Sequence, residues 1–143
     1  MPRHCYPCAI LLLCLLTAAL SGCGKKSWPS PKAGEDRFAF QEIQGEAVEG
    51  CLNIEARMSG KHQNLRELVL EIEAKEEPCP GCPFSPTETV ELPLSSAKIA
   101  RNGPILSITW CGLKPGMAYR WRLKGVNVYP SIQDAVSEVK RLE

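Results

Sequence analysis

The chain has 143 residues, with 17 Lys and Arg residues against 16 Asp and Glu residues, so its formal net charge at pH 7 is +1. This length suits one compact domain and excludes two large ones, and the balanced charge gives no basis for binding nucleic acid or another polyanion. The eight cysteines are the unusual part of the composition.

The N-terminal region has the pattern of a secretory leader. A short positive stretch at residues 3–4 precedes an apolar run at residues 9–19 (AILLLCLLTAA), which is too short to span a hydrocarbon core of about 30 Å. Residues 20–23 (LSGC) then resemble the lipobox of bacterial lipoproteins. In that family the leader is cut before the cysteine, whose thiol is diacylated. The resemblance therefore implies that residues 1–22 are a signal peptide and that Cys23 carries the lipid.

The segment after the lipobox predicts which membrane carries the protein and how the domain is connected to it. The residue after Cys23 is Gly24, whereas an aspartate there would resemble an inner-membrane retention signal. In a bacterium with two membranes, the glycine therefore favours the outer membrane, with the protein on its periplasmic or surface side. Two acyl chains anchor a protein stably. Residues 24–36 (GKKSWPSPKAGED) are rich in Gly, Ser, Pro and Lys, which predicts a flexible tether. We therefore divide the chain into a leader at 1–22, a lipidated cysteine and tether at 23–36, and a domain at 37–143.

From residue 38 onward, apolar and polar residues alternate with the period of a strand. The clearest alternating stretches are residues 51–58, 68–74, 87–92, 106–111 and 119–124. Residues 101–104 (RNGP) contain an Asn-Gly pair that favours a hairpin turn. Short strands with turn residues between them predict an all-β, antiparallel β-sandwich of the immunoglobulin-like kind. Residues 133–142 fit either a helix or a final edge strand.

A second resemblance supports this fold. Residues 113–119 (LKPGMAY) are similar to the Leu-x-Pro-Gly-Thr-x-Tyr signature of fibronectin type III domains, and the following YRWRLKGVN stretch is similar to that family's sixth strand. The resemblance implies that Leu113, Pro115 and Gly116 form a turn leading into a tyrosine corner. In such a corner the ring of Tyr119 packs inward while its hydroxyl bonds nearby backbone. The chain departs from the family in having methionine for the threonine and no tryptophan in its second predicted strand.

Four cysteines follow the leader and the lipidation site, and an even number in an exported chain predicts two disulfides. The fibronectin-like topology places strands A, B and E in one sheet and C′, C, F and G in the other. It implies that Cys51, at the start of strand B, lies beside Cys111, at the end of strand E. Because both cysteines fall outside the apolar set, they share the outer face of one sheet, where a disulfide can form.

The other two cysteines, in the Cys79-Pro80-Gly81-Cys82 motif after strand C, admit several interpretations. A local disulfide is the plainest, and we predict it. A redox dithiol normally needs a helix N-terminus to lower the thiol pKa, and no helix is expected here. A four-cysteine zinc site is geometrically possible, because the strand ends that carry the four cysteines lie at the same end of the expected sandwich. An oxidising compartment, however, opposes free thiolates. Crossed disulfides are the remaining alternative.

Few residues suggest catalysis. His62 is the only histidine after the leader, so no Ser/His/Asp set can be assembled without it, and no phosphate-cradling glycine loop is present. Glu71 and Glu73 face outward on strand C, opposite a basic row on strand F formed by Arg120, Arg122 and Lys124. We interpret these charges as cross-strand ion pairs. We therefore expect that the chain is not an enzyme and that it needs neither a cofactor nor a metal.

The sequence thus predicts a membrane-anchored lipoprotein whose domain serves protein binding, adhesion or envelope assembly. Its expected partners are the membrane, through the lipid, and another envelope protein or a surface polymer. The exposed turns at residues 61–64 and 101–102 are the first candidates for contact. The alternative is a thiol-redox or zinc-binding envelope protein that uses Cys79 and Cys82.

Overall fold

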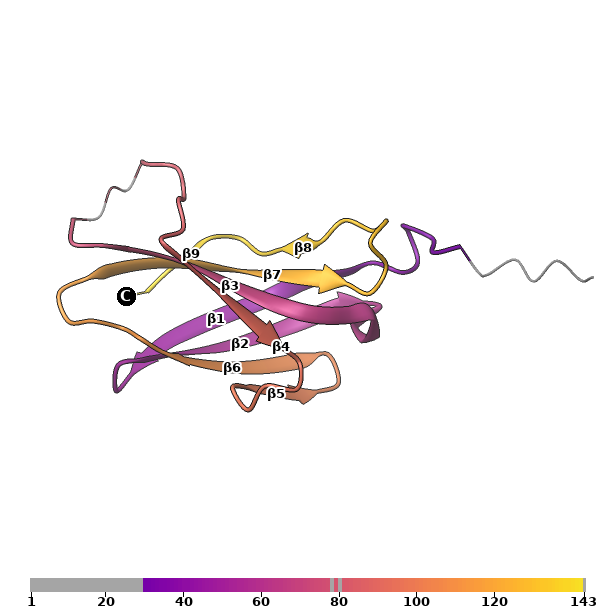
Figure 1. Cartoon of the computed structure of the whole chain (residues 1–143), viewed down its shortest axis with the longest axis horizontal. Coiled ribbons are helices and arrows are strands. Elements are labelled where there is room, and N and C mark those ends of the chain that lie inside the picture. The colour runs from indigo at the N-terminus through magenta and orange to yellow at the C-terminus, as the bar shows by residue number, and fades with distance from the viewer. Residues whose placement is uncertain (1–29, 78, 80, 143) are drawn as a thin grey trace, which may run out of the picture. The chain divides into compact units, whose positions relative to one another are not determined.

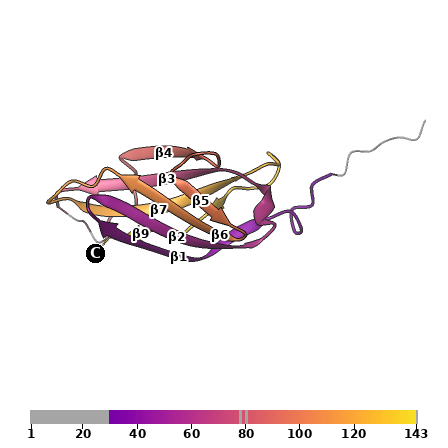
Figure 2. The same ribbon diagram turned by 90° about the horizontal axis from the view of Figure 1, so that it is seen from below.

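The computed structural model of the chain describes residues 30–77, 79 and 81–142. Two antiparallel sheets pack face to face (Figures 1 and 2), which confirms the predicted all-β sandwich. The compact unit comprises Pro31–Glu143.

The two sheets contain the strands that the resemblance implies, and the first sheet has one further strand, β5, that was not predicted. The first sheet has the order β1-β2-β6-β5, with β1 at Phe38–Val48, β2 at Cys51–Gly60, β6 at Ile105–Cys111 and β5 at Ile99–Asn102. The second sheet has the order β4-β3-β7-β8, with β4 at Glu88–Pro93, β3 at Leu65–Lys75, β7 at Ala118–Asn127 and β8 at Ala135–Val136. Strand β9, at Lys140–Arg141, also pairs with β7, and the 3-10 turn η1, at His62–Asn64, joins β2 to β3.

The core lies between the two sheets and consists of the alternate residues that the sequence pattern selects. On β2, Leu52, Ile54, Ala56 and Met58 are all buried. A shift of one residue in register would turn this whole set toward solvent, so burial fixes the pairing. The matching residues on the other strands are also buried: Leu68, Leu70, Ile72, Leu106, Ile108, Trp110, Tyr119, Trp121 and Leu123.

A glycine in β1 makes room for the tryptophan of β7. Trp121 is only 1% exposed, and a Cβ atom built on Gly45 would lie 2.3 Å from its Cζ2 atom. The indole therefore packs directly on the backbone of β1, which a larger residue would prevent. The chain thus has a core tryptophan on β7, although its second strand carries none.

The C-terminal segment is a strand, which resolves the alternative between strand and helix at residues 133–142. It is interrupted, because β8 and β9 pair with different parts of β7. Between them, the Ser137 N–H donates to the Leu123 carbonyl oxygen at 2.8 Å, and Ser137 Oγ accepts from the Leu123 N–H at 2.9 Å. The serine hydroxyl thus replaces a backbone acceptor where the ladder is broken.

The chain is fixed to the sandwich just before β1. The Asp36 N–H donates to the Lys32 carbonyl oxygen at 2.8 Å, closing a turn. The Asp36 carbonyl oxygen then accepts from the side-chain amides of Asn64 and Asn127, at 3.0 and 3.1 Å. The last residues before position 37 therefore belong to the compact unit.

Candidate functional site

The site is formed by the connection between β3 and β4, residues 76–87, which we call the β3–β4 loop. The loop stands on the side of the second sheet that faces away from the first sheet (Figure 1). A disulfide joins Cys79 to Cys82 within it, and the Cys82 N–H donates to the Cys79 carbonyl oxygen at 3.2 Å. At its far end the Thr87 N–H donates to the Ile72 carbonyl oxygen at 2.7 Å, so the loop rejoins the sheet on β3.

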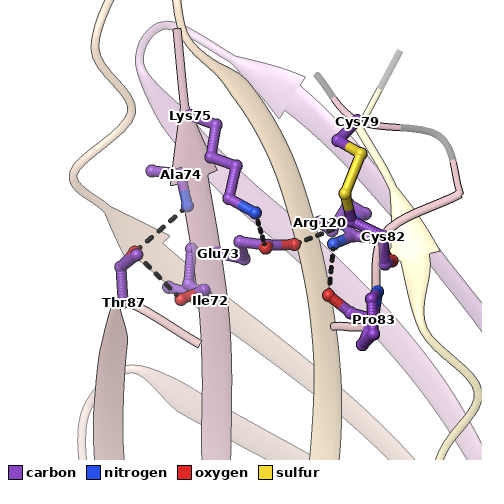
Figure 3. Close-up of polar contacts among 9 residues, drawn as sticks. All are labelled: Ile72, Glu73, Ala74, Lys75, Cys79, Cys82, Pro83, Thr87 and Arg120. Carbon is purple, nitrogen blue, oxygen red and sulfur yellow. Dashed lines mark hydrogen bonds and ion pairs between the residues drawn. A yellow bond between two sulfur atoms is a disulfide. The ribbon is translucent and has the colours of Figure 1, made fainter. Parts of the chain in front are cut away.

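Arg120 attaches the loop to the sheet, as Figure 3 shows. Its Nη1 donates to the Cys82 carbonyl oxygen at 2.9 Å, and its Nη2 donates to the Pro83 carbonyl oxygen at 3.0 Å. Its Nε donates to Glu73 Oε2, because the register of β3 and β7 places the two residues directly opposite. The planar fork of the guanidinium can serve these three acceptors at once.

Glu73 is a buried carboxylate held by two cations. Its side chain is 1% exposed, and Lys75 Nζ lies 2.6 Å from its Oε1 atom (Figure 3). The hydrogen bond from Arg120, followed by that from Lys75, lowers the pKa of Glu73 to about 2, against a desolvation effect that raises it. The carboxyl is therefore ionised throughout the physiological range and is not a proton donor.

These contacts confirm the predicted cross-strand pairs and add a feature. Glu73 pairs with Arg120, and Glu71 pairs with Arg122. Sequence reasoning placed Glu73 on an outer face of the sheet, whereas its side chain is buried. The loop residue Phe84 was also missed. Its ring centroid lies 5.0 Å from the Cζ atom of Arg122, close enough for a cation–π contact. The sequence did contain a clue to this contact, because Phe84 is a large apolar residue in an otherwise polar loop.

A pocket of about 220 Å³ lies beside the buried carboxylate. Three cationic side chains and one carboxylate are among its lining residues, together with the first cysteine of the motif and the corner tyrosine: Lys75, Arg120, Arg141, Glu73, Cys79 and Tyr119. Two of these cations, Lys75 and Arg120, pair with Glu73.

The structure confirms the disulfide between Cys51 and Cys111. The two residues are direct partners in the β2–β6 register, with Cα atoms 3.9 Å apart. Alternation puts both side chains on the outer face of the first sheet. The bond closes a separation of 60 residues and joins the first residue of one strand to the last residue of another.

Tyr119 makes the contact that defines a tyrosine corner. Its side chain is buried, and its hydroxyl oxygen accepts from the Lys114 N–H at 2.7 Å. Leu113 packs against the core, while Gly116 has a φ of 78°, which glycine adopts without strain. The corner fixes the start of β7 and hence the position of Arg120.

The two exposed turns that the sequence singled out lie against each other. Arg101 Nη2 donates to the His62 carbonyl oxygen at 2.7 Å. Residues 61–64 and 101–102 therefore form one surface, which we call the η1 surface. Cys23, the predicted lipid site, lies outside the described residues.

In residues 30–77, 79 and 81–142, no group of three or more His, Cys, Asp and Glu side chains is arranged to hold a metal ion. Within the same described residues, no helix has the length and apolarity needed to cross a membrane. No protein-family model matches the chain, and no curated protein is similar to it at a significant level.

Proposed function

We propose that the chain is a bacterial lipoprotein anchored through Cys23, most favourably in the outer membrane, whose sandwich domain binds another envelope protein or a surface polymer without catalysis. The observation that carries this proposal is the Cys51–Cys111 disulfide on the outer face of the first sheet. Disulfides persist in oxidising compartments outside the cytoplasm. The bond therefore supports export, as the lipobox residues do.

The charges of the site favour binding over catalysis. Glu73 is ionised and pairs with Lys75 and Arg120. General acid–base catalysis works best with a pKa near the operating pH, whereas the pKa of Glu73 is about 2. These side chains hold a loop in place, which suits a domain that presents a fixed surface.

The η1 surface is our first candidate for partner contact, in adhesion or in envelope assembly. Lys61 and Arg101 are exposed on it, and the bond between Arg101 and His62 holds the two turns together. Loops supported by a rigid sandwich commonly carry recognition. The two cations favour an acidic patch on the partner.

Labelling with radioactive palmitate tests the anchor. The wild-type chain should incorporate the label and fractionate with membranes, and Cys23→Ala should lose both properties. Cys14→Ala is the matched control, because Cys14 lies within the predicted leader. An unlabelled wild-type chain in the soluble fraction would contradict the proposal.

Cross-linking on intact cells tests the binding role. The double variant Lys61→Glu, Arg101→Glu should lose a specific cross-linked band that Lys98→Glu, an exposed change outside this surface, retains. A band that survives the double variant unchanged would place the contact elsewhere and would overturn the assignment of the η1 surface.

A further inference from the structure

We propose that β1, an edge strand of the first sheet, is a docking site for an extended segment of a partner protein, which adds to the sheet as a further strand. The segment that fits this edge alternates cationic with aliphatic side chains. The inference goes beyond the proposed function because it names a mode of binding and uses a surface other than the η1 surface. It rests on the free backbone groups of β1 and on the side chains that flank them.

Strand β1 is the longest sheet edge among the described residues. It spans Phe38–Val48 and contains no Lys, Arg or Pro. The other edge strands are shorter: β4 has six residues and ends in Pro93, β5 has four, and β8 and β9 have two each. Proteins commonly protect edges by shortness, Lys, Pro or a bulge, because unpaired backbone groups invite another strand. The one bulge of β1 lies between Phe40 and Glu42, so residues 42–48 form a regular edge at the margin of the sandwich (Figure 2).

The hydrogen bonds of β2 determine which backbone groups of β1 are free. The Met58 N–H donates to the Pro104 carbonyl oxygen at 2.8 Å, and the Gly112 N–H donates to the Gly50 carbonyl oxygen at 3.3 Å. These bonds lie at the two ends of the β2–β6 pairing. Since the backbone groups of a strand point alternately to its two neighbours, even-numbered residues of β2 bond to β6 and odd-numbered residues bond to β1.

The free groups of β1 follow from its register with β2. After the bulge, each odd-numbered residue of β2 stands opposite an even-numbered residue of β1. The N–H and C=O groups of Ile43, Gly45 and Ala47 are therefore directed away from β2. Gly45 and Ala47 are exposed, and for a glycine this exposure is exposure of the backbone itself. An added strand would bond to these three residues.

The outer face beside this edge carries free carboxylates. Glu46 of β1 and Glu55 of β2 are exposed and make no ion pair with any described residue, whereas Glu42 pairs with Arg57 at 3.2 Å. Glu46 and Glu55 also line one hollow of about 410 Å³. A side chain that points outward from an added strand stands beside Glu46 at cross-strand distance. The free negative charge therefore favours a cation there.

The same charges disfavour a second copy of this chain as the added strand. Residues 42–48 contain two carboxylates and no cation. Pairing two copies of β1 would bring carboxylates of both copies onto one face of the sheet. Like charges on facing strands destabilise the pair, whereas opposite charges stabilise it. A partner segment with cations at alternate positions is therefore the better fit.

The inner side of the edge carries apolar side chains. Ile43 lines a hollow together with Val136, whose side chain is 51% exposed. Ala47 lines another hollow, of about 350 Å³, whose lining includes three further apolar residues: Leu113, Met117 and Leu142. Successive side chains of an added strand point to opposite faces, so those between its cations would meet these residues. Aliphatic side chains suit that position.

Two synthetic peptides test the proposal on the mature, detergent-extracted, isotope-labelled protein. The probe is the capped peptide Thr-Lys-Val-Lys-Val-Lys-Val-Thr, and the control peptide has Glu in place of each Lys. Hydrogen exchange is followed by NMR. The Lys peptide should slow exchange of the Gly45 and Ala47 amides at least about tenfold. The amides of Gln44 and Glu46, which already bond to β2, should be unchanged, and the Glu peptide should protect none of the four.

Three results would overturn the proposal. The first is that the Lys peptide gives no protection at millimolar concentration. The second is that both peptides protect equally, which would mean that the carboxylates do not select the partner. The third is that Gly45 and Ala47 are protected before any peptide is added, increasingly so with protein concentration, which would mean that a second copy occupies the edge.

Two variants separate the backbone from the charge. Ala47→Pro removes an N–H that points away from β2, and proline is tolerated on edge strands, so this variant should fold but bind the Lys peptide at least about tenfold more weakly. Glu46→Lys leaves the backbone intact and should weaken binding about fivefold or more. Glu91→Lys, an exposed change on β4, is the matched control and should bind as the wild type does. Wild-type affinity in Glu46→Lys or in folded Ala47→Pro would contradict docking at β1. None of these results bears on the palmitate experiment or on the η1 surface, which fail or succeed separately.

Discussion

Arg120 donates from Nη1 to the carbonyl oxygen of Cys82 across 2.9 Å, which ties the disulfide-bearing loop to strand β7. The same guanidinium pairs with Glu73, so one side chain joins the loop to a buried charge on β3. The loop and the ion cluster are therefore parts of one structure.

Replacing Arg120 with lysine should loosen the loop while keeping a cation beside Glu73. A single ammonium group cannot serve the carboxylate and the two loop carbonyl oxygens in the geometry of a guanidinium. We expect faster amide exchange in residues 82–87 of Arg120→Lys, with a modest fall in Tm. Hydrogen exchange followed by mass spectrometry measures this effect. Arg57→Lys, at an exposed pair with Glu42, is the control, and unchanged exchange in Arg120→Lys would show that the loop is held by other contacts.

The buried carboxylate predicts how stability depends on acid. The pKa of Glu73 is lowered from 4.5 to about 2 in the folded chain, chiefly by the hydrogen bond from Arg120. A lowered folded pKa contributes stability that is complete above the unfolded value and is lost as the pH falls toward the folded value. Between about pH 4.5 and pH 2, the wild type should therefore lose stability that Glu73→Gln does not lose.

Urea unfolding at a series of pH values measures the difference. Glu42→Gln, which changes an exposed carboxylate, should follow the wild type over the same range. If Glu73→Gln also follows the wild type, Glu73 is not the group that links folding to acid.

The two disulfides should differ in what they contribute to stability. By chain entropy, a bond that closes 60 residues contributes about 4 kcal/mol, and one that closes a few residues contributes about 2 kcal/mol. Cys51→Ala, Cys111→Ala should thus unfold at a clearly lower urea concentration than Cys79→Ala, Cys82→Ala. The opposite order would mean that the loop disulfide fixes the fold.

Gly45 tests the packing of the core. Adding a methyl group there would bring an atom within 2.3 Å of Trp121, and overpacking of this kind costs about 1–3 kcal/mol. Gly45→Ala should lower Tm and alter the tryptophan fluorescence. Gly34→Ala, where an added Cβ meets nothing within 4 Å, should do neither. A stable Gly45→Ala with unchanged fluorescence would mean that the sheets separate easily at this point.

Alternation alone was enough to predict most of the sandwich. The inward residues of β2, from Leu52 to Met58, were correct because only one face of each strand can be buried. The Cys51–Cys111 pair followed from the strand order that the fibronectin resemblance implies, together with the face on which alternation places each cysteine. The interrupted C-terminal strand was not predictable in this way, because the Ser137 hydroxyl substitutes for a ladder contact and masks the period of two.

The site was only partly predictable. The pairing of Glu73 with Arg120 followed from facing positions on neighbouring strands, but the burial of Glu73 did not. Whether an outward-facing side chain is buried depends on how neighbouring loops fold. A loop as long as residues 76–87 has no periodicity in its sequence that indicates its path. The contacts of Arg120 with backbone oxygens could not be predicted either. Every residue has a carbonyl group, so the sequence does not indicate which carbonyl groups an arginine binds.

Mass spectrometry of the mature protein purified from membranes, with and without reductant, tests the central claim most directly. We predict an N-terminal acylated Cys23, with residues 1–22 removed. Without reductant, Cys51 should be linked to Cys111 and Cys79 to Cys82, and reductant should release four thiols. An unacylated chain that retains residues 1–22, with all four thiols free before reduction, would contradict the account.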